Sequence, residues 1–256
     1  MVTVFLDILV VSLSVGLAVA GMLVVRRFVP FSVRDAHNAA AGMIYAALYV
    51  MFGLSVGFSL FLVWQQFEIS RTTVEDEANN VFQVYALSAN FPEPERSRIQ
   101  DLATSYARTV VEDEWPLMQQ GRTSPRAAEI AIELRASVED FQPHTEAGSG
   151  LYSETLTQVD QLEEQRALRL LDIRQGIPAV LWVVLVTGGT LTIAFTYLFG
   201  MREAWLHGLT VAALTVLIAL LLFTIGTLNH PFDGDARVRP DAFEAVQHTI
   251  EETGKH

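Results

Sequence analysis

Two stretches of this 256-residue sequence have residue types and spacing that suit ion binding. The first is DAHNAAAG, residues 35–42, which follows Arg34 and leads into an apolar run. Asp35 or Asn38 is a suitable helix cap, and the N-terminus of such a helix attracts anions because its first N–H groups have no partner within the helix. We therefore predict that Arg34 and Asn38 form an anion-attracting mouth, with a plain capping turn between two helices as the alternative.

The second stretch is TIGTLNHPFDGDARVRPDAFEAV, residues 224–246. It begins in an apolar run and then places Phe232 just before a glycine that is flanked by Asp233 and Asp235. An aromatic ring and two carboxylates on a tight turn at the end of such a run raise the question of what they hold. The residues alone do not answer it.

Patterns typical of catalysis are missing. The sequence has no cysteine, no HExxH, no GxSxG and no Walker A motif, and its six histidines are too scattered to pair at helical spacing. The triplet Glu-Asp-Glu occurs at 75–77 and 112–114, but carboxylates two residues apart on a helix point to different faces and make a poor acid–base pair. We predict that the protein is not an enzyme.

Four apolar blocks dominate a composition that is 51% hydrophobic. They are Val4–Val25, Met43–Trp64, Pro178–Phe199 and Ala204–Leu228. Each is long enough to cross a membrane, since a helix needs about 20 residues to span a hydrocarbon core about 30 Å thick. The first lacks the basic start of a signal peptide, so we expect it to be retained as a span. The predicted location is the plasma (inner) membrane, with several passes through the bilayer.

Acidic residues gather between the second and third blocks. Residues 65–176 hold 20 Asp or Glu against 10 Arg, and the whole chain has a net charge of −12. This excludes nucleic acid as a partner, because a nucleic-acid site needs a basic face. We expect most of these carboxylates to form a solvated surface.

The predicted fold is an all-α membrane protein with four transmembrane helices in two hairpins and a helical bundle inserted between spans two and three. Its parts are hairpin 1 at 1–64, the acidic helical insert at 65–176, hairpin 2 at 177–228 and a C-terminal tail with the PFDGD turn at 229–256. Both hairpin turns carry arginine, so the positive-inside rule puts both turns in the cytoplasm and the insert and both termini outside.

The apolar spacing predicts four helices in the insert. The first continues out of the second span as far as FPEPE, and the second is kinked or ended by Pro116 and closed by Gly121. The third has Ser124 as its N-cap, with proline in the first turn. The loop PHTEAGSG follows, and the last helix begins at Leu151.

These stretches together resemble a family, the bestrophin-like bacterial membrane proteins (the DUF4239 domain). The resemblance covers nearly the whole chain. It is carried by DAHNAAAGMIYAALY, WQQFE, VEDEANNVFQVY, FPEPER, YARTVVEDEWPLMQQG and HPFDGDARVRPDAF, of which the EWP and PFxG elements are the most specific. It implies an anion channel of chloride type, built as a homo-oligomer in the lipid bilayer and as a pentamer if it follows bestrophins proper.

The resemblance also implies an answer for the PFDGD turn. The segment after the fourth span forms a calcium clasp in animal bestrophins, and PFDGDA is similar to a degraded form of it. Pro231 and Phe232 would anchor the turn, and Asp233 and Asp235 would bind Ca²⁺ through hard carboxylate oxygens. Calcium is thus the one cofactor that the resemblance implies.

A pore lining is implied in the same way. The bestrophin neck is a stack of bulky apolar residues one helical turn apart, and this spacing recurs twice in the second span. The resemblance implies a lining formed by Leu48, Phe52, Val56 and Ser59. Leu54, Phe58 and Leu62 have the same spacing and form an alternative stripe.

Two features depart from bestrophins proper. Their Arg-Trp-Trp-Glu pattern after the second span is absent, and they keep the insert and both termini in the cytoplasm, opposite to the side that the arginines here predict. Two functions stay open: an oligomeric anion channel or channel-like pore, and a non-conducting membrane protein whose acidic insert senses or binds a partner.

Overall fold

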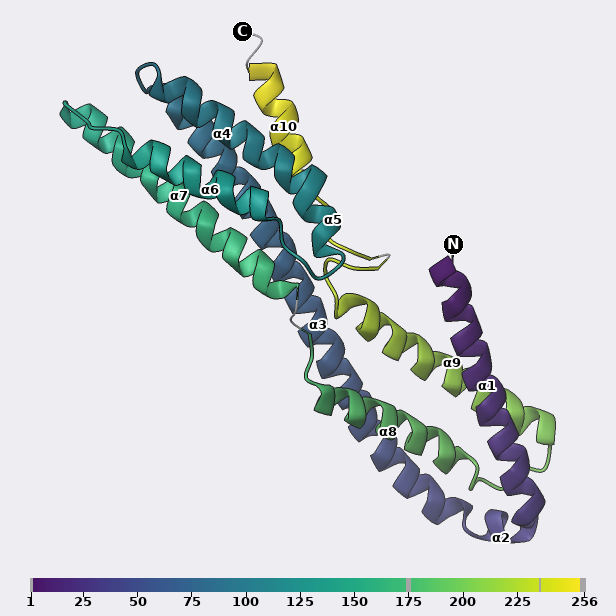
Figure 1. Ribbon diagram of the computed structural model, residues 1–256. Helices are drawn as coiled ribbons and strands as arrows, with labels where there is room; N and C mark the ends of the chain where they lie inside the picture. The colour runs from purple at the N-terminus through teal and green to yellow at the C-terminus, as the bar shows by residue number, and fades with distance from the viewer. Residues whose placement is uncertain (1, 174–175, 235, 254–256) are drawn as a thin grey trace. The chain divides into compact units, whose positions relative to one another are not determined.

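The chain folds into helices that group into two compact units (Figure 1). The computed structural model describes residues 2–173, 176–234 and 236–253, and every regular element in these ranges is helical, which confirms the all-α prediction. The span unit comprises residues 1–65 and 177–229, and the insert unit comprises residues 66–176 and 230–256. The stretch after the fourth apolar helix therefore folds with the insert.

The span unit holds the four apolar helices. It consists of α1 (Val2–Phe28), α2 (Phe31–Ala36), the first part of α3 (Asn38–Ser88), α8 (Ala179–Thr196) and α9 (Ala204–Leu228). In the described part of the chain, α1, α3, α8 and α9 are long and apolar enough to cross a membrane. The short helix α2 lies in the turn between the first two of them.

Small residues let the helices of the span unit pack closely. Helix α1 packs along α9, and α8 contacts both (Figure 1). Helix α3 packs on α8 through Phe52, whose ring would lie 2.8 Å from a Cβ atom added at Gly188. A larger residue at Gly188 would require the ring to move. Close approach at small residues is how helices commonly associate in lipid, where burial from water cannot drive them together.

The insert unit is a helical bundle with an apolar interior. Its elements are the remainder of α3, then α4 (Glu95–Thr109), the π-helical turn η1 (Val110–Glu114), α5 (Trp115–Met118), α6 (Pro125–Glu139), α7 (Glu146–Asp172) and α10 (Asp241–Thr253). Helix α4 contacts α6 and α10, and α6 contacts α7 (Figure 1). Residues from each long helix are fully buried in one core, among them Val81, Ile99, Leu134, Leu162 and Phe243.

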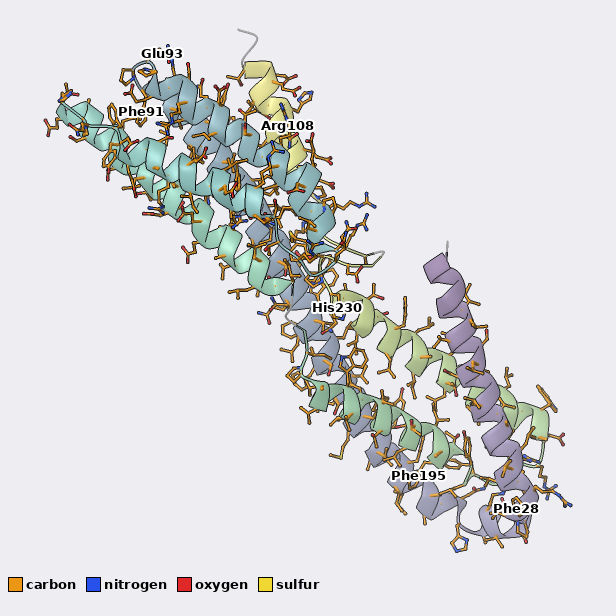
Figure 2. All side chains as sticks on the ribbon, in the orientation of Figure 1. Phe28, Phe91, Glu93, Arg108, Phe195 and His230 are labelled. Atoms are coloured by element: carbon orange, nitrogen blue, oxygen red, sulfur yellow. The ribbon has the colours of Figure 1, made fainter. Side chains whose placement is uncertain are left out.

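The two units differ in the chemistry of their side chains, as Figure 2 shows. Nitrogen and oxygen atoms are dense on the insert helices and sparse on the span helices.

At the turn between α3 and α4, Phe91 is buried and packs on Phe141 with ring centroids 4.7 Å apart. The first insert helix ends at Ser88, just before the FPEPE break that predicted its end.

Helix caps explain where two further insert helices begin. Ser124 accepts a hydrogen bond from the Ala127 N–H at 3.2 Å, which confirms it as the N-cap of α6. Helix α7 begins at Glu146, so the predicted loop PHTEAGSG and the predicted start at Leu151 were wrong at this boundary. The Thr145 hydroxyl accepts from the Gly148 N–H at 3.0 Å, and this cap stabilises the first turn despite the glycines in it.

The helix before Pro116 widens instead of kinking at the proline. Residues 110–114 form the π turn, α5 follows, and Gly121 closes the segment with a φ of 70°. Proline has no N–H and its ring collides with the carbonyl four residues back in an α-helix, so a wider turn before Pro116 removes the conflict.

Helix α10 was not predicted, because only the PFDGD turn of the C-terminal tail was considered.

We predict that Trp115→Ala lowers the free energy of unfolding by about 3–5 kcal/mol, the usual cost of emptying a large aromatic site. Trp115 is only 3% exposed, and its ring meets those of Phe232 and Phe243 edge-on, with centroids 5.9 and 6.3 Å away. Denaturant unfolding of the full chain in detergent, followed by circular dichroism, measures the change. Trp115→Phe is the control and should lose much less, since it keeps an aromatic ring. A loss below about 0.5 kcal/mol for Trp115→Ala would contradict the packing role.

Candidate functional site

Asn38 ties the turn between α1 and α3 to the turn between α8 and α9. Its side-chain carbonyl accepts from the Gly200 N–H at 2.8 Å, and its amide donates to the Gly200 carbonyl at 3.3 Å and to Asp35 at 3.2 Å. The backbones of the two turns approach so closely that a Cβ atom added at Gly200 would lie 2.5 Å from the Asp35 backbone nitrogen. Asn38 therefore clamps two turns together, a role that the sequence alone did not reveal.

Two arginines at the same end of the span unit bind backbone carbonyls instead of carboxylates. Arg34 is 4% exposed and donates to the Phe199 carbonyl at 3.2 Å, while its Nε atom is buried without a hydrogen bond to any described residue. Arg26 donates to the carbonyls of Met201 and Arg202 at 3.0 and 3.1 Å. Among the described residues, neither arginine forms an ion pair with a carboxylate.

The positive charge at this end is consequently not neutralised by the groups that hold it. Burial, and then the nearby charge of Arg26, lower the pKa of Arg34 from its ordinary value, but an arginine still keeps its proton at neutral pH. His207 is buried beside them, and its Nε2 atom lies 2.9 Å from the Thr196 carbonyl oxygen. A carbonyl only accepts, so Nε2 carries the proton and Nδ1 can accept from Arg26 at 3.5 Å.

The predicted pore-lining residues lie mostly on the packed face of α3. Phe52 is 8% exposed, Val56 and Ser59 are buried, and Leu48 is half-buried. Phe52 and Val56 pack in a cluster with residues of α8 and α9. This burial favours helix packing as the role of the stripe, and its role as a pore lining stays a prediction.

The alternative stripe of α3 lies on the opposite, open face. Leu54, Phe58 and Leu62 are 60%, 61% and 49% exposed in the subunit. The sequence could not distinguish the two stripes, because both have the same spacing and both are apolar. A side chain that lines a path shared by several subunits is open within one subunit, and the second stripe is the more open of the two.

The PFDGD turn is anchored by its aromatic residue. Phe232 is buried in the insert core against Trp115, and the Pro231 carbonyl accepts from the Val238 N–H at 2.7 Å, which closes the loop. Gly234 has a φ of 78°, a backbone conformation that favours glycine. The start of the turn is thus anchored in the insert unit.

The described residues of this turn do not by themselves make a calcium site. The Asp233 carboxylate accepts from the Gly234 N–H at 2.7 Å and is exposed, and Asp235 lies outside the described residues. Calcium takes six to eight oxygen ligands, and no cluster of three or more His, Asp or Glu suited to a metal ion occurs in the described part of the chain. Calcium binding at Asp233 and Asp235 stays a prediction.

The insert core contains a buried ionic network centred on Arg169. Its guanidinium binds Glu77 through two hydrogen bonds of 2.6 and 2.9 Å, and it also donates to Glu114 at 2.8 Å. Arg166 donates to Glu114 at 2.6 Å, and the Tyr106 hydroxyl donates to Glu77 at 2.5 Å. Arg169 and both glutamates are completely buried and the Arg166 side chain is 14% exposed, so two positive and two negative charges balance largely out of contact with water.

The surroundings of Arg169 and Tyr106 shift the pKa of both groups. Burial alone would lower the pKa of Arg169, yet the charge and hydrogen bonds of Glu77 outweigh it and hold the pKa well above its ordinary value. Burial, and then the charge of Glu77, raise the pKa of Tyr106 well above its ordinary value, so its hydroxyl stays a donor. The buried part of this cluster offers no open position for a substrate, and the loss of one partner would leave a buried charge uncompensated.

This network was not predicted from the sequence, although the triplets that contain two of its glutamates were identified. Glu77 and Glu114 are the third residues of the two Glu-Asp-Glu triplets, which were assigned to the solvated surface. The signal was the position of each glutamate on the apolar stripe of its helix. Their shared partner, Arg169, is distant in the sequence, so neither triplet indicated it.

The chain has the features of an all-helical integral membrane protein. Its apolar helices carry no charge in their middle parts, and a separate helical insert lies between them in the sequence. The Bestrophin-like domain family matches residues 12–243, and the chain therefore belongs to this family.

Solved structures share the fold at low sequence identity. A crystal structure of a bacterial bestrophin homologue from Klebsiella pneumoniae is similar with a TM-score of 0.67 at 14% identity, covering 94% of this chain and 95% of that one. A variant of that homologue reaches 0.73 at 12% identity, with 96% and 99% covered. A structure described as a membrane protein reaches 0.74 at 12% identity, with 98% and 99% covered. None of the curated proteins matches this chain.

We predict that Arg169→Met lowers the free energy of unfolding by about 3–5 kcal/mol, because it leaves two buried carboxylates with too little positive charge. Adding Glu77→Gln to this variant should recover part of the loss, since one uncompensated charge is then removed. Denaturant titration of the full chain measures both effects. Arg98→Met is the matched control on an exposed arginine and should change little. An Arg169→Met variant as stable as the wild type would show that the network does not hold the core.

Proposed function

We propose that this protein is an anion channel of the plasma membrane, assembled from several copies of the chain. The observation that carries the proposal is the unneutralised positive charge of Arg26 and Arg34 at one end of the span unit. The two turns at this end, residues 26–37 and 197–203, add Arg27 and Arg202 against only Asp35 and Glu203. Positive charge at the mouth of an apolar path raises the local concentration of anions and repels cations.

The conducting path would follow the open face of α3. The span helices carry no charge in their middle parts, so a path between them offers no fixed site to a permeant cation. Leu54, Phe58 and Leu62 would form rings of apolar side chains around a common axis and act as a hydrophobic constriction. This arrangement needs several subunits, and membership of the Bestrophin-like family supports a symmetric ring, a pentamer as in bestrophins proper.

Planar-bilayer recording of the purified protein tests the proposal. We expect a chloride current that falls when a large anion such as gluconate replaces chloride. Phe58→Ala should raise this current several-fold, because it widens the apolar constriction. Phe52→Ala removes the same side chain from the packed face of the same helix. Lower stability with an unchanged unitary current would assign the path to the open face, and a raised current would assign it to the predicted lining of Leu48, Phe52 and Val56.

Oligomeric state decides between the two functions that the sequence left open. A symmetric ring with chloride current supports the channel. A ring that passes no chloride above the lipid baseline would favour a non-conducting membrane protein whose acidic insert binds a partner. A monomer or a dimer without a central path would remove the basis of the channel proposal.

The proposed topology has four spans in two hairpins, with the insert on the extracytoplasmic side as the arginine distribution indicates. Reporters fused after Val2 and after His256 should report the same compartment, because four crossings return the chain to its starting side. A reporter inserted near Gly148 should read outside. Opposite compartments for the two termini would contradict the four spans, and a cytoplasmic reading near Gly148 would overturn the orientation while leaving the spans intact.

A further inference from the structure

A groove of about 400 Å³ on the insert unit is lined by arginines from two separate segments. Arg71 comes from α3, and Arg237 and Arg239 come from the stretch that leads into α10. All three side chains are exposed. None of them belongs to the buried network or to the arginine-bearing end of the span unit.

The stretch with two of these arginines is held in a fixed position. Val238, which lies between them, is buried in the insert core, and its N–H donates to the Pro231 carbonyl at 2.7 Å. Pro240 follows directly, and its carbonyl accepts from the Glu244 N–H at 3.0 Å where α10 begins. Since both ends of the stretch are fixed, the backbone that carries Arg237 and Arg239 is already placed at the groove, and only the two side chains have to be ordered on binding.

Charge is distributed unevenly in the groove. Arg71 pairs with Glu75 at 3.0 Å, and Asp241 is the second acid in the lining. Arg237 and Arg239 form no ion pair with any described carboxylate. Three guanidinium groups against two carboxylates give a net positive groove, although residues 65–176 hold twice as many acids as arginines. This local excess of positive charge favours an anionic ligand.

We propose that this groove binds a phosphate group, with Arg237 and Arg239 donating to its oxygens and Arg71 adding positive charge. The planar guanidinium offers paired N–H donors that match two phosphate oxygens at once. The N-terminus of α10, a helix of 13 residues, also lines the groove through Asp241 and Ala242 and adds partial positive charge. The volume suits a phosphate-bearing group, larger than a chloride ion.

The phosphate can come from a phospholipid headgroup or from a soluble phosphate. Both lining segments follow a span in the sequence: Arg71 lies beyond Trp64 on the same helix, and Arg237 and Arg239 follow the end of α9. Headgroup phosphates are therefore close to the segments that build the groove. The chemistry of recognition is the same for both sources, so the experiment separates them.

The test measures binding of two probes to the purified full chain in detergent. Inorganic phosphate is titrated by microscale thermophoresis, and phosphatidylglycerol is titrated by native mass spectrometry against a glycolipid that lacks phosphate. We expect the wild type to bind at least one phosphate probe and the double variant Arg237→Gln/Arg239→Gln to bind it about tenfold more weakly or worse. Binding of phosphatidylglycerol without binding of inorganic phosphate assigns the groove to headgroups, and binding of inorganic phosphate assigns it to a soluble source.

The matched control is Arg98→Gln/Arg126→Gln, which removes two exposed arginines elsewhere on the insert unit and should keep the affinity. If this control loses as much affinity as the groove variant, or if the wild type binds neither probe, the proposal is overturned. Arg237→Lys/Arg239→Lys keeps the charge and the fold, and it should bind more weakly than the wild type because the paired donors are lost. The groove lies wholly within the insert unit, so phosphate binding and chloride current succeed or fail separately.

Discussion

Arg169 is the residue on which the insert unit depends. Its side chain reaches Glu77 on α3 and Glu114 on η1 from α7, so three helical segments meet at one guanidinium. Removing these charges from water is costly, and the close hydrogen bonds compensate only while every partner is in place. Arg169 also lies over the Trp115 ring at 5.6 Å, and that ring supports Phe232. Trp115 therefore links the stretch after α9 to the Arg169 network.

In the span unit, by contrast, the charged side chains are held without being neutralised. Arg26 and Arg34 are held by carbonyl oxygens, which orient the side chains but leave their positive charge in full. A carboxylate in the same place would have fixed the two turns equally well and would have cancelled that charge. Asn38 supplies the mechanical clamp with an uncharged amide. The geometry of this end and its electrostatic potential thus depend on different residues.

The sequence predicted features that depend on local order and missed those that depend on distant partners. Long apolar blocks predicted the span helices, and the cap at Ser124 was read correctly from its neighbours. The buried role of Glu114 depends on an arginine in another helix, and neither the triplet around it nor its spacing contains that information. The two apolar stripes of α3 have equal spacing, and the Phe52 face is the packed one because it meets distant residues of α8 and α9, among them Gly188. Helix α10 has a local signal of its own, since Phe243, Val246 and Ile250 recur at helical spacing, but this signal was not used to predict it.

The π turn at η1 has a consequence for the evolution of chain length. Tyr106 and Val110 are buried before or at the turn, and Glu114 and Met118 take the equivalent buried positions eight residues later. Two turns of an ordinary α-helix use about seven residues, so η1 accommodates one additional residue without rotating the helix that follows. A relative that lacks one residue between Val110 and Glu114 would keep both flanks in phase with a plain α-helix. A single-residue gap in alignments of this family is therefore expected within this turn, where an insertion leaves the rest of the core undisturbed.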